Sequence, residues 1–248
     1  MKSNKYQRRF YRDWVKEKGL YLLRITVKET DLEVLTDEPV DKEFIKGIIQ
    51  HYRRDIESYI NKDNRFQTAL KPIEVELRAR PIIKAMARAA KKAGVGPMAA
   101  VAGAIAGFLG KDLLKTGLKE VIIENGGDIF LATRKTRNIA VYSGRSRLWR
   151  GLGLRIKAQD SPLGICTSSG TIGHSLSFGR ADSVVILAKD PCLADAVVTA
   201  IANRIASPED LKGAVNFSRS ISGISGALAI LKNNLVGWGK IEIVRIVH

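Results

Sequence analysis

The sequence predicts an α+β fold, with packed helices and a mixed, largely antiparallel sheet. Segments with helical periodicity and segments with strand-like alternation follow one another without the regular order of β-α-β units. Glycines such as Gly144 and Gly151 separate several of the strand-like segments, which is typical of short turns. We expect a single domain over residues 1–248, with a soft boundary near Gly94 between an N-terminal lobe (1–94) and a site-bearing lobe (95–248).

In the first half, alternating apolar residues predict a hairpin formed by residues 20–27 and 31–35. Apolar residues at helical spacing predict a helix over 41–60, and Pro81 is a favourable start for a second helix over 82–93. An Ala- and Gly-rich segment, 98–116, predicts a tightly packed buried helix whose most apolar part, 98–110, is too short to span a bilayer.

The second half is expected to alternate between short strands and helices. An apolar pair at 165–166 leads into a loop of Ser, Thr and Gly residues. The predicted strands are 121–123, 129–132, 138–142, 153–158, 183–188 and 240–247, and the predicted helices are 191–206, 208–217 and 224–235.

Composition indicates a globular protein with anionic partners. Of the 248 residues, 45% are hydrophobic and 27% are charged, and the net charge is +16, which favours nucleotides, nucleic acids or acidic proteins. Eight basic residues and no acidic ones lie between Asp128 and Asp160, so this run predicts either an anion-attracting surface or an ordinary solvated face. Cys166 and Cys192 fit no metal or redox spacing, and no secretion signal is visible, so we expect a cytoplasmic protein.

Asp195 and Thr199 form the first candidate site. Four residues apart on a predicted helix, the carboxylate and the hydroxyl share one face. Hard oxygen ligands on a helix that faces a loop of small donors suit a Mg²⁺ ion or a phosphate group. The alternative is that Asp195 is a favourable acid near the start of its own helix and that Thr199 faces the core.

Two glycine-containing stretches form the second candidate site. Asn125-Gly126-Gly127-Asp128 follows a strand, where its glycines would let the backbone approach a ligand, although the same residues also make a plain hairpin turn. The stretch Thr167-Ser168-Ser169-Gly170 offers hydroxyl and N–H groups for a phosphate, but no Gly-Lys-Ser/Thr follows to make a Walker loop. His174, just beyond, is a candidate general base or a structural residue, and zinc is not expected with three histidines in the chain.

The order of these motifs resembles the ApbE-like family, the FAD-dependent FMN transferases, over about residues 95–206. A small-residue helix after Gly96 is followed by the Gly-Gly pair, the Thr-Ser-Ser-Gly loop, His174, the strand 183–188 and Leu-Ala-Asp-Ala-Val-Val-Thr. The sequence is similar in particular to the compact, uncharacterised branch found in archaea and anaerobic bacteria.

The resemblance implies a flavin site with a metal. Asp195 and Thr199 would be Mg²⁺ ligands, helped by a carbonyl near Ala99 or Ala100, and the two glycine-containing stretches would line the pocket for FAD. In the family, the metal neutralises the pyrophosphate of FAD while a protein threonine attacks the phosphorus next to FMN. The basic run could supplement the metal.

The sequence also departs from the family pattern. Ala100 and Val101 stand where the family helix carries a Lys, and His174 is followed by Ser-Leu-Ser-Phe-Gly-Arg-Ala-Asp in place of Ile-Asp-Pro-x-Thr-Gly. A divergent transferase and an enzyme of changed chemistry therefore both remain open. The alternatives are a non-catalytic accessory factor in anaerobic sulfur or cofactor metabolism and, last, a nucleic-acid-binding protein. A protein partner or self-association is compatible with each reading.

Overall fold

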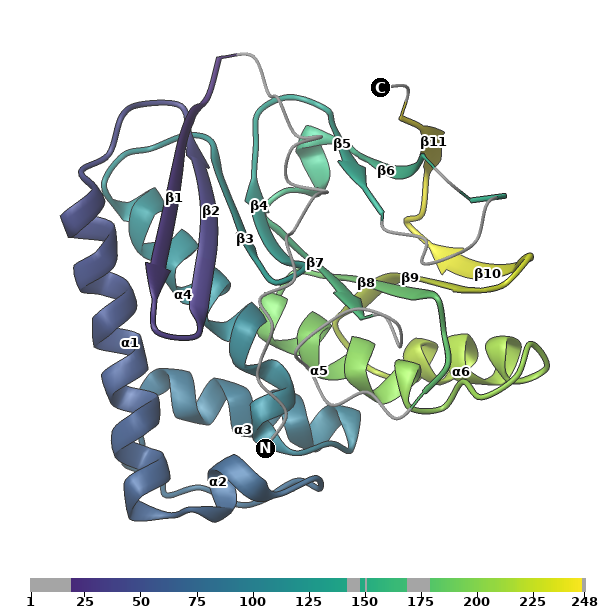
Figure 1. The fold of residues 1–248 in the computed structure, drawn as a ribbon, viewed down its shortest axis with the longest axis horizontal. Helices are drawn as coiled ribbons and strands as arrows, with labels where there is room; N and C mark the ends of the chain where they lie inside the picture. The colour runs from purple at the N-terminus through teal and green to yellow at the C-terminus, as the bar shows by residue number, and fades with distance from the viewer. Residues whose placement is uncertain (1–18, 142–147, 150, 169–178, 247–248) are drawn as a thin grey trace.

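A computed structural model describes residues 19–141, 148–149, 151–168 and 179–246. Its main feature is an eight-stranded antiparallel sheet with the order β1-β2-β3-β4-β7-β8-β9-β10 (Figure 1). The strands are β1 (Tyr21–Val27), β2 (Thr30–Thr36), β3 (Val121–Asn125), β4 (Asp128–Ala132), β7 (Leu163–Ser168), β8 (Ser183–Ala188), β9 (Ile224–Leu231) and β10 (Asn234–Gly239). The predicted α+β class with a largely antiparallel sheet is confirmed.

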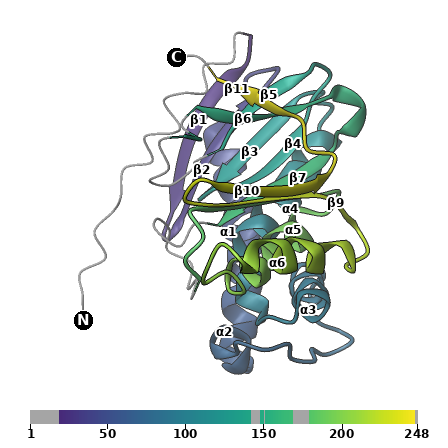
Figure 2. The ribbon, with the colours of Figure 1, turned by 90° about the vertical axis from the view of Figure 1, so that its right-hand side faces the viewer.

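Helices cover one face of this sheet, and a small second sheet covers the other (Figure 2). The second sheet has the order β11-β6-β5, and leucine and isoleucine side chains from both sheets form the core between them. The remaining strands are β5 (Arg137–Ala140), β6 (Leu152–Ile156) and β11 (Ile243–Arg245), and the helices are α1 (Lys42–Lys62), α2 (Arg65–Thr68), α3 (Pro81–Ala93), α4 (Val101–Lys115), α5 (Pro191–Ala202) and α6 (Asp210–Arg219).

The predicted N-terminal elements form for identifiable local reasons. Lys28, at φ 53°, turns the β1–β2 hairpin, and Asp41 caps α1 by accepting the backbone N–H of Phe44. Pro81 occupies the first turn of α3, and Gly94 ends that helix in the left-handed conformation. The largest buried cluster contains residues from both sides of Gly94, and the division into lobes stays a prediction.

Helix α4 is built from small residues because it packs closely on its neighbours. A Cβ at Gly110 would lie 2.1 Å from the Phe130 ring of β4, and a Cβ at Gly107 would lie 3.2 Å from Pro191 of α5. With the preceding 3-10 turn, the helical segment Pro97–Lys115 has 19 residues and a mean hydropathy of 1.3, enough by length and composition to cross a membrane. It is longer than the apolar stretch predicted from the sequence, but 56% of its most apolar 18-residue window is buried in the protein, as in an ordinary core helix.

Two sequence predictions are wrong. Residues 224–235, expected to be helical, form β9 and the start of β10, with a turn at Lys232 (φ 57°). The pair Ile165-Cys166, expected to lead directly into a loop, belongs to β7, which continues to Ser168 between β4 and β8. Strands β9 and β7 lie inside the sheet, where both faces are covered and periodicity does not distinguish an apolar strand from a buried helix.

Candidate functional site

Three elements meet at the candidate site: the β3–β4 hairpin, the first turn of α4 and the first half of α5. Asn125 Nδ2, at the end of β3, donates a 3.1 Å hydrogen bond to the carbonyl oxygen of Ala102. From the other side, the backbone N–H of Gly103 donates a 2.8 Å hydrogen bond to Asp195 Oδ2 of α5. The start of α4 is therefore held between the predicted ligand-binding hairpin and the predicted metal-binding helix.

Asp195 caps a helix other than its own. Helix α5 begins at Pro191 with Asp190 as its N-cap, so Asp195 lies beyond the first turn, and its alternative role as a first-turn acid of α5 is wrong. Its carboxylate instead accepts the backbone N–H groups of Ala102 and Gly103 at the N-terminus of α4, where the helix dipole favours negative charge. Burial raises the pKa of Asp195 to about 7, although these two hydrogen bonds oppose the shift.

Glycine at position 103 makes this contact possible. A Cβ there would lie 2.4 Å from the carbonyl oxygen of Pro191 and 2.7 Å from Asp195 Cβ, distances that no real side chain tolerates. Gly164 of β7 is equally close to Pro191, since its Cβ would lie 2.5 Å from the Pro191 Cα. Helix α5 therefore approaches both α4 and β7 through glycines, and this close packing brings the Asp195 carboxylate to the start of α4.

Asp128 is the second buried carboxylate of the site. It begins β4 and is paired in register with Asn125 of β3 and Cys166 of β7. Burial is the main cause that raises its pKa well above the usual range, and the nearby charge of Asp195 adds to it. Its Oδ1 is buried and has no hydrogen-bond partner among the described residues. A buried acceptor left unpaired in this way is uncommon in native proteins and calls for a physical explanation.

The β3–β4 hairpin places the two predicted binding stretches side by side. Gly126 and Gly127 both have positive φ, 68° and 102°, which are the values that a two-residue hairpin turn requires. Glu124 Oε1 accepts the backbone N–H of Gly127 at 2.7 Å. The carbonyl oxygen of Gly127 in turn accepts the backbone N–H of Thr167 at 3.1 Å. The stretch is thus a hairpin turn, and this turn adjoins the end of β7.

The described part of the chain brings most of the predicted site residues together. The turn formed by residues 125–128 adjoins Thr167. Asn125 and Asp195 bind opposite sides of the first turn of α4, through Ala102 and Gly103 respectively. Thr199 is buried one turn further along α5, and Ser168 is buried at the end of β7. The predicted residues Ser169, Gly170 and His174 lie outside the described residues.

Two residues of the site were missed from the sequence. Gly103 falls within the predicted small-residue helix without a role of its own, and Glu124 directly precedes the predicted ligand-binding turn. Their roles depend on contacts with residues distant in sequence or on the turn conformation, and the Gly-rich composition of α4 was the one available signal for close packing. Within the described ranges, no group of three or more His, Cys, Asp or Glu side chains is arranged to hold a metal ion.

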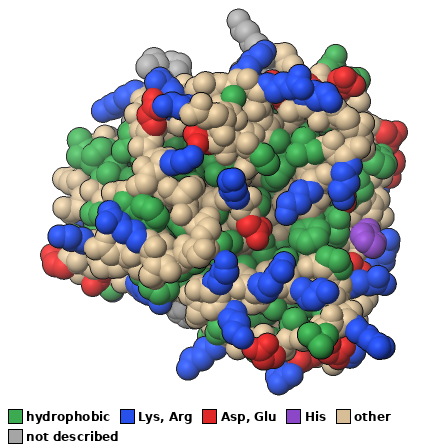
Figure 3. All heavy atoms as spheres, turned by 180° about the vertical axis from the view of Figure 1, so that it is seen from behind, with side chains coloured by type: hydrophobic (Ala, Val, Ile, Leu, Met, Phe, Trp, Pro, Cys, Tyr) green, Lys and Arg blue, Asp and Glu red, His purple; other side chains and the backbone are tan. Residues whose placement is uncertain are grey.

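The basic run between Asp128 and Asp160 does not form one surface over its described residues. Arg137, expected to attract anions, is buried and forms an ion pair with Glu120, while Arg134 and Lys135 are exposed. Arg145, Arg147 and Arg150 lie outside the described residues. Over the face drawn in Figure 3, Lys and Arg side chains are spread between apolar patches and outnumber the acidic ones.

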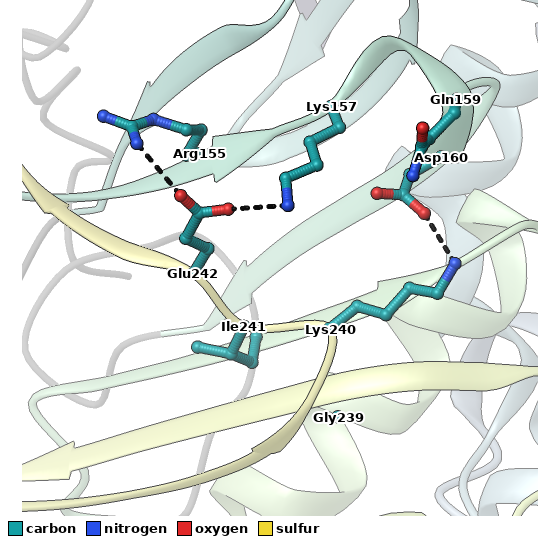
Figure 4. Close-up of a pocket in the computed structure, with 8 residues that line it drawn as sticks. All are labelled: Arg155, Lys157, Gln159, Asp160, Gly239, Lys240, Ile241 and Glu242. Atoms are coloured by element: carbon teal, nitrogen blue, oxygen red, sulfur yellow. Dashed lines mark hydrogen bonds and ion pairs between the residues drawn. The ribbon is translucent and has the colours of Figure 1, made fainter.

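An open groove of about 290 Å³ lies away from these residues, between β6 and the segment that joins β10 to β11 (Figure 4). Its charged side chains are paired with one another: Arg155 and Lys157 with Glu242, at 3.0 and 3.4 Å, and Lys240 with Asp160 at 2.5 Å. The groove contains none of the predicted site residues, and its internal ion pairs leave it little net attraction for an anion.

Comparison with known proteins identifies the family. A family model described as AbpE bacteria matches residues 12–219. UPF0280 proteins of Methanocaldococcus jannaschii and Methanocella arvoryzae are 39% and 38% identical to this chain, covering 90% and 88% of it and 92% and 89% of their own lengths.

Solved structures share the fold at low sequence identity. The flavin transferase ApbE of Vibrio cholerae superposes with a TM-score of 0.59 at 14% identity, covering 89% of this chain and 97% of its own. The apbe protein of Thermotoga maritima gives a TM-score of 0.57 at 14% identity, covering 92% and 97%. Together with the family match and the archaeal relatives, these likenesses establish that the chain belongs to the ApbE-like family.

Proposed function

We propose that the chain binds a flavin dinucleotide together with Mg²⁺ where the β3–β4 hairpin meets α4 and α5, and that it transfers FMN from FAD to a hydroxyl group of an acceptor protein. One observation carries the proposal: the buried Asp195 carboxylate caps the start of α4, and Asp128, whose Oδ1 is buried without a partner, lies near enough to feel its charge. The fold shared with the flavin transferase of Vibrio cholerae supports it.

The residues present fit a hard divalent cation. Two carboxylates that repel each other inside the protein are stabilised when a cation lies between them, and Asp128 Oδ1 still has its acceptor capacity. A carboxylate has about four acceptor positions, so Asp195 can bind a cation while it caps α4. The hydroxyl of Thr199, one turn away, would supply a further oxygen ligand.

The family resemblance gives each part of the site a role. When bound, Mg²⁺ would neutralise the pyrophosphate of the dinucleotide, so that a nucleophile can approach the phosphorus atom. The β3–β4 hairpin, with Gly127 beside Thr167, would let the backbone approach the ligand closely and fix its orientation. His174 is retained as the candidate general base for the hydroxyl group of the acceptor protein.

The experiment that tests the proposal is a fluorescence titration of FAD with and without Mg²⁺, on the wild type and on Asp195→Asn. Asparagine keeps an oxygen acceptor for the N–H of Gly103 but removes the negative charge that a cation needs. Asp112→Asn is the matched control, because Asp112 lies in the last turns of α4 and is hydrogen-bonded to Tyr52 and Lys115.

We expect Mg²⁺-dependent FAD binding in the wild type and in Asp112→Asn, and its loss in Asp195→Asn. A flavin that binds equally well without Mg²⁺ would contradict the metal assignment. If no flavin binds under any condition, the flavin assignment is wrong and the family fold serves another ligand.

A further inference from the structure

Asp128 has an unused acceptor inside the proposed site. The residue is 6% exposed, and its Oδ1 has no hydrogen-bond partner in the described part of the chain. The other buried side-chain atoms without a hydrogen-bond partner are Arg53 Nε, Trp149 Nε1 and Ser183 Oγ, so Asp128 provides the one buried carboxylate oxygen without a partner among the described residues. Buried acceptors are normally satisfied by protein, water or an ion, so this oxygen indicates a missing neighbour.

The surroundings of Asp128 indicate what that neighbour is. The carboxylate lies near that of Asp195, and Glu124 adds a third negative charge in the vicinity. A water molecule could donate a hydrogen bond to Oδ1, but it would leave the repulsion between the carboxylates in place. A cation satisfies the oxygen and removes the repulsion at the same time.

The donor atoms also select the kind of cation. Both carboxylates and the Thr199 hydroxyl are hard oxygen ligands, which favour Mg²⁺ or Mn²⁺. The Cys166 thiol is near, but its Sγ is engaged at 3.4 Å with the carbonyl oxygen of Pro191, and burial raises its pKa well above the usual range. The thiol therefore stays protonated, and a soft metal gains no thiolate ligand here.

We propose that Asp128 is a direct ligand of the divalent cation assigned above to Asp195 and Thr199, so that the cation joins β4 to α5. This inference rests on the proposed function, since it adds a ligand to the same site. Asp128 directly follows Gly126-Gly127, so binding of the cation would fix the hairpin that is proposed to line the flavin pocket. Metal binding and flavin binding would then be coupled through the β3–β4 turn.

The test measures Mn²⁺ binding to the full chain in the absence of flavin, by electron paramagnetic resonance and calorimetry. The variants are Asp128→Asn, Asp195→Asn and the control Asp112→Asn, each checked for folding by circular dichroism. Asp128→Ser is the second variant, because its hydroxyl can still accept the backbone N–H of Thr167 in a smaller volume.

We expect Asp128→Asn and Asp128→Ser to weaken Mn²⁺ binding about tenfold or more, as Asp195→Asn does, while Asp112→Asn binds like the wild type. Without metal, both Asp128 variants should melt within about 3 °C of the wild type or above it, because they remove a buried carboxylate that has one unpartnered oxygen. Wild-type affinity in the Asp128 variants, with loss in Asp195→Asn, would overturn this inference and leave the proposed function standing. If the wild type does not bind Mn²⁺, both fail, and if neither Asp128 variant folds, the residue is a structural requirement and the inference is wrong.

Discussion

Gly103 of α4 and Asp195 of α5 are 92 residues apart in sequence. Because Gly103 has no side chain, the Asp195 carboxylate can reach and cap the N-terminus of α4. The N–H of Gly103 is 2.8 Å from Asp195 Oδ2, and a Cβ on Gly103 would lie 2.7 Å from the Cβ of Asp195. The proposed metal site and the packing of α4 on α5 therefore depend on the same contact.

Replacement of Gly103 by alanine should destabilise the protein although alanine favours helices. The added methyl group would lie 2.4 Å from the backbone oxygen of Pro191, so α5 must move away and the Asp195 cap must lengthen. Overpacking of this kind costs about 1–3 kcal/mol of unfolding free energy, which urea unfolding would measure. Mg²⁺-dependent flavin binding should weaken in the same variant.

Two other helical glycines are controls for this substitution. A Cβ at Gly107 meets the Pro191 side chain at 3.2 Å, so Gly107→Ala should cost less than Gly103→Ala. Gly213 in α6 has open space around its Cβ position, so Gly213→Ala should stabilise the protein by about 0.5–1 kcal/mol. Equal effects at all three positions would contradict the packing argument.

The stability of the protein should depend on the buried ion pair between Glu120 and Arg137, which connects the large sheet to the small one. Glu120 precedes β3, Arg137 begins β5, and Thr133 Oγ1 donates to Glu120 and accepts from Arg137. Loss of one partner leaves a buried charge uncompensated, so Arg137→Met should cost about 3–5 kcal/mol in urea unfolding.

The double variant Glu120→Gln with Arg137→Met tests the cause of that loss. Because it leaves no unpaired charge, it should recover much of the stability that Arg137→Met loses. The single variant Glu120→Gln completes the set. If the loss of unfolding free energy in the double variant equals the sum of the losses in the two single variants, the effect comes from side-chain packing and not from charge.

Stability of the metal-free protein should fall as the pH rises through the range where Asp195 titrates. Its pKa is raised by burial from 3.8 to about 7, so between these values the folded state holds a proton that the unfolded state has released. Because the folded state binds this proton more tightly, Asp195 contributes stability that is fully present below pH 3.8. This contribution is lost as the pH rises through about 7.

Comparison with Asp195→Asn isolates this effect from the other titrating groups. From about pH 5 to about pH 8, the wild type should lose stability relative to the variant, as measured by urea midpoints in the presence of a chelator. Saturating Mg²⁺ should reverse the loss at the higher pH. A constant difference between the two proteins would show that Asp195 does not titrate in this range.

Local sequence signals predicted most of the fold. The β1–β2 hairpin, α1, α3 and α5 each have their own caps or turn residues, and those signals are readable from neighbouring positions. Residues 224–235 were mistaken for a helix because β9 is flanked by β8 and β10 and packed by α6, which permits a continuous apolar run.

The candidate site could be predicted only in part. The pair Asp195 and Thr199 was visible because four-residue spacing is a local property of helices, and the Gly-Gly pair was visible as turn chemistry. That Asp195 caps α4 depends on a contact between separate elements, and that Arg137 is buried depends on Glu120 lying beside it. Neither relationship has a signature within either segment alone.

The carbonyl oxygen of Gly127 accepts the backbone N–H of Thr167 beside the proposed flavin pocket. Gly127 has φ +102°, and its Cβ would lie 3.3 Å from the carbonyl oxygen of Thr167, so Gly127→Ala should strain the turn and displace the end of β7. Gly117, after α4, has a similar φ of +105° and nothing near its Cβ position. Gly117→Ala is therefore the matched control, because it strains the backbone without contacting Thr167. Each alanine should cost about 1–3 kcal/mol in unfolding free energy, but Gly127→Ala alone should weaken FAD binding in the fluorescence titration. If Gly117→Ala weakens binding equally, global destabilisation explains the loss, and the turn has no specific part in holding the flavin.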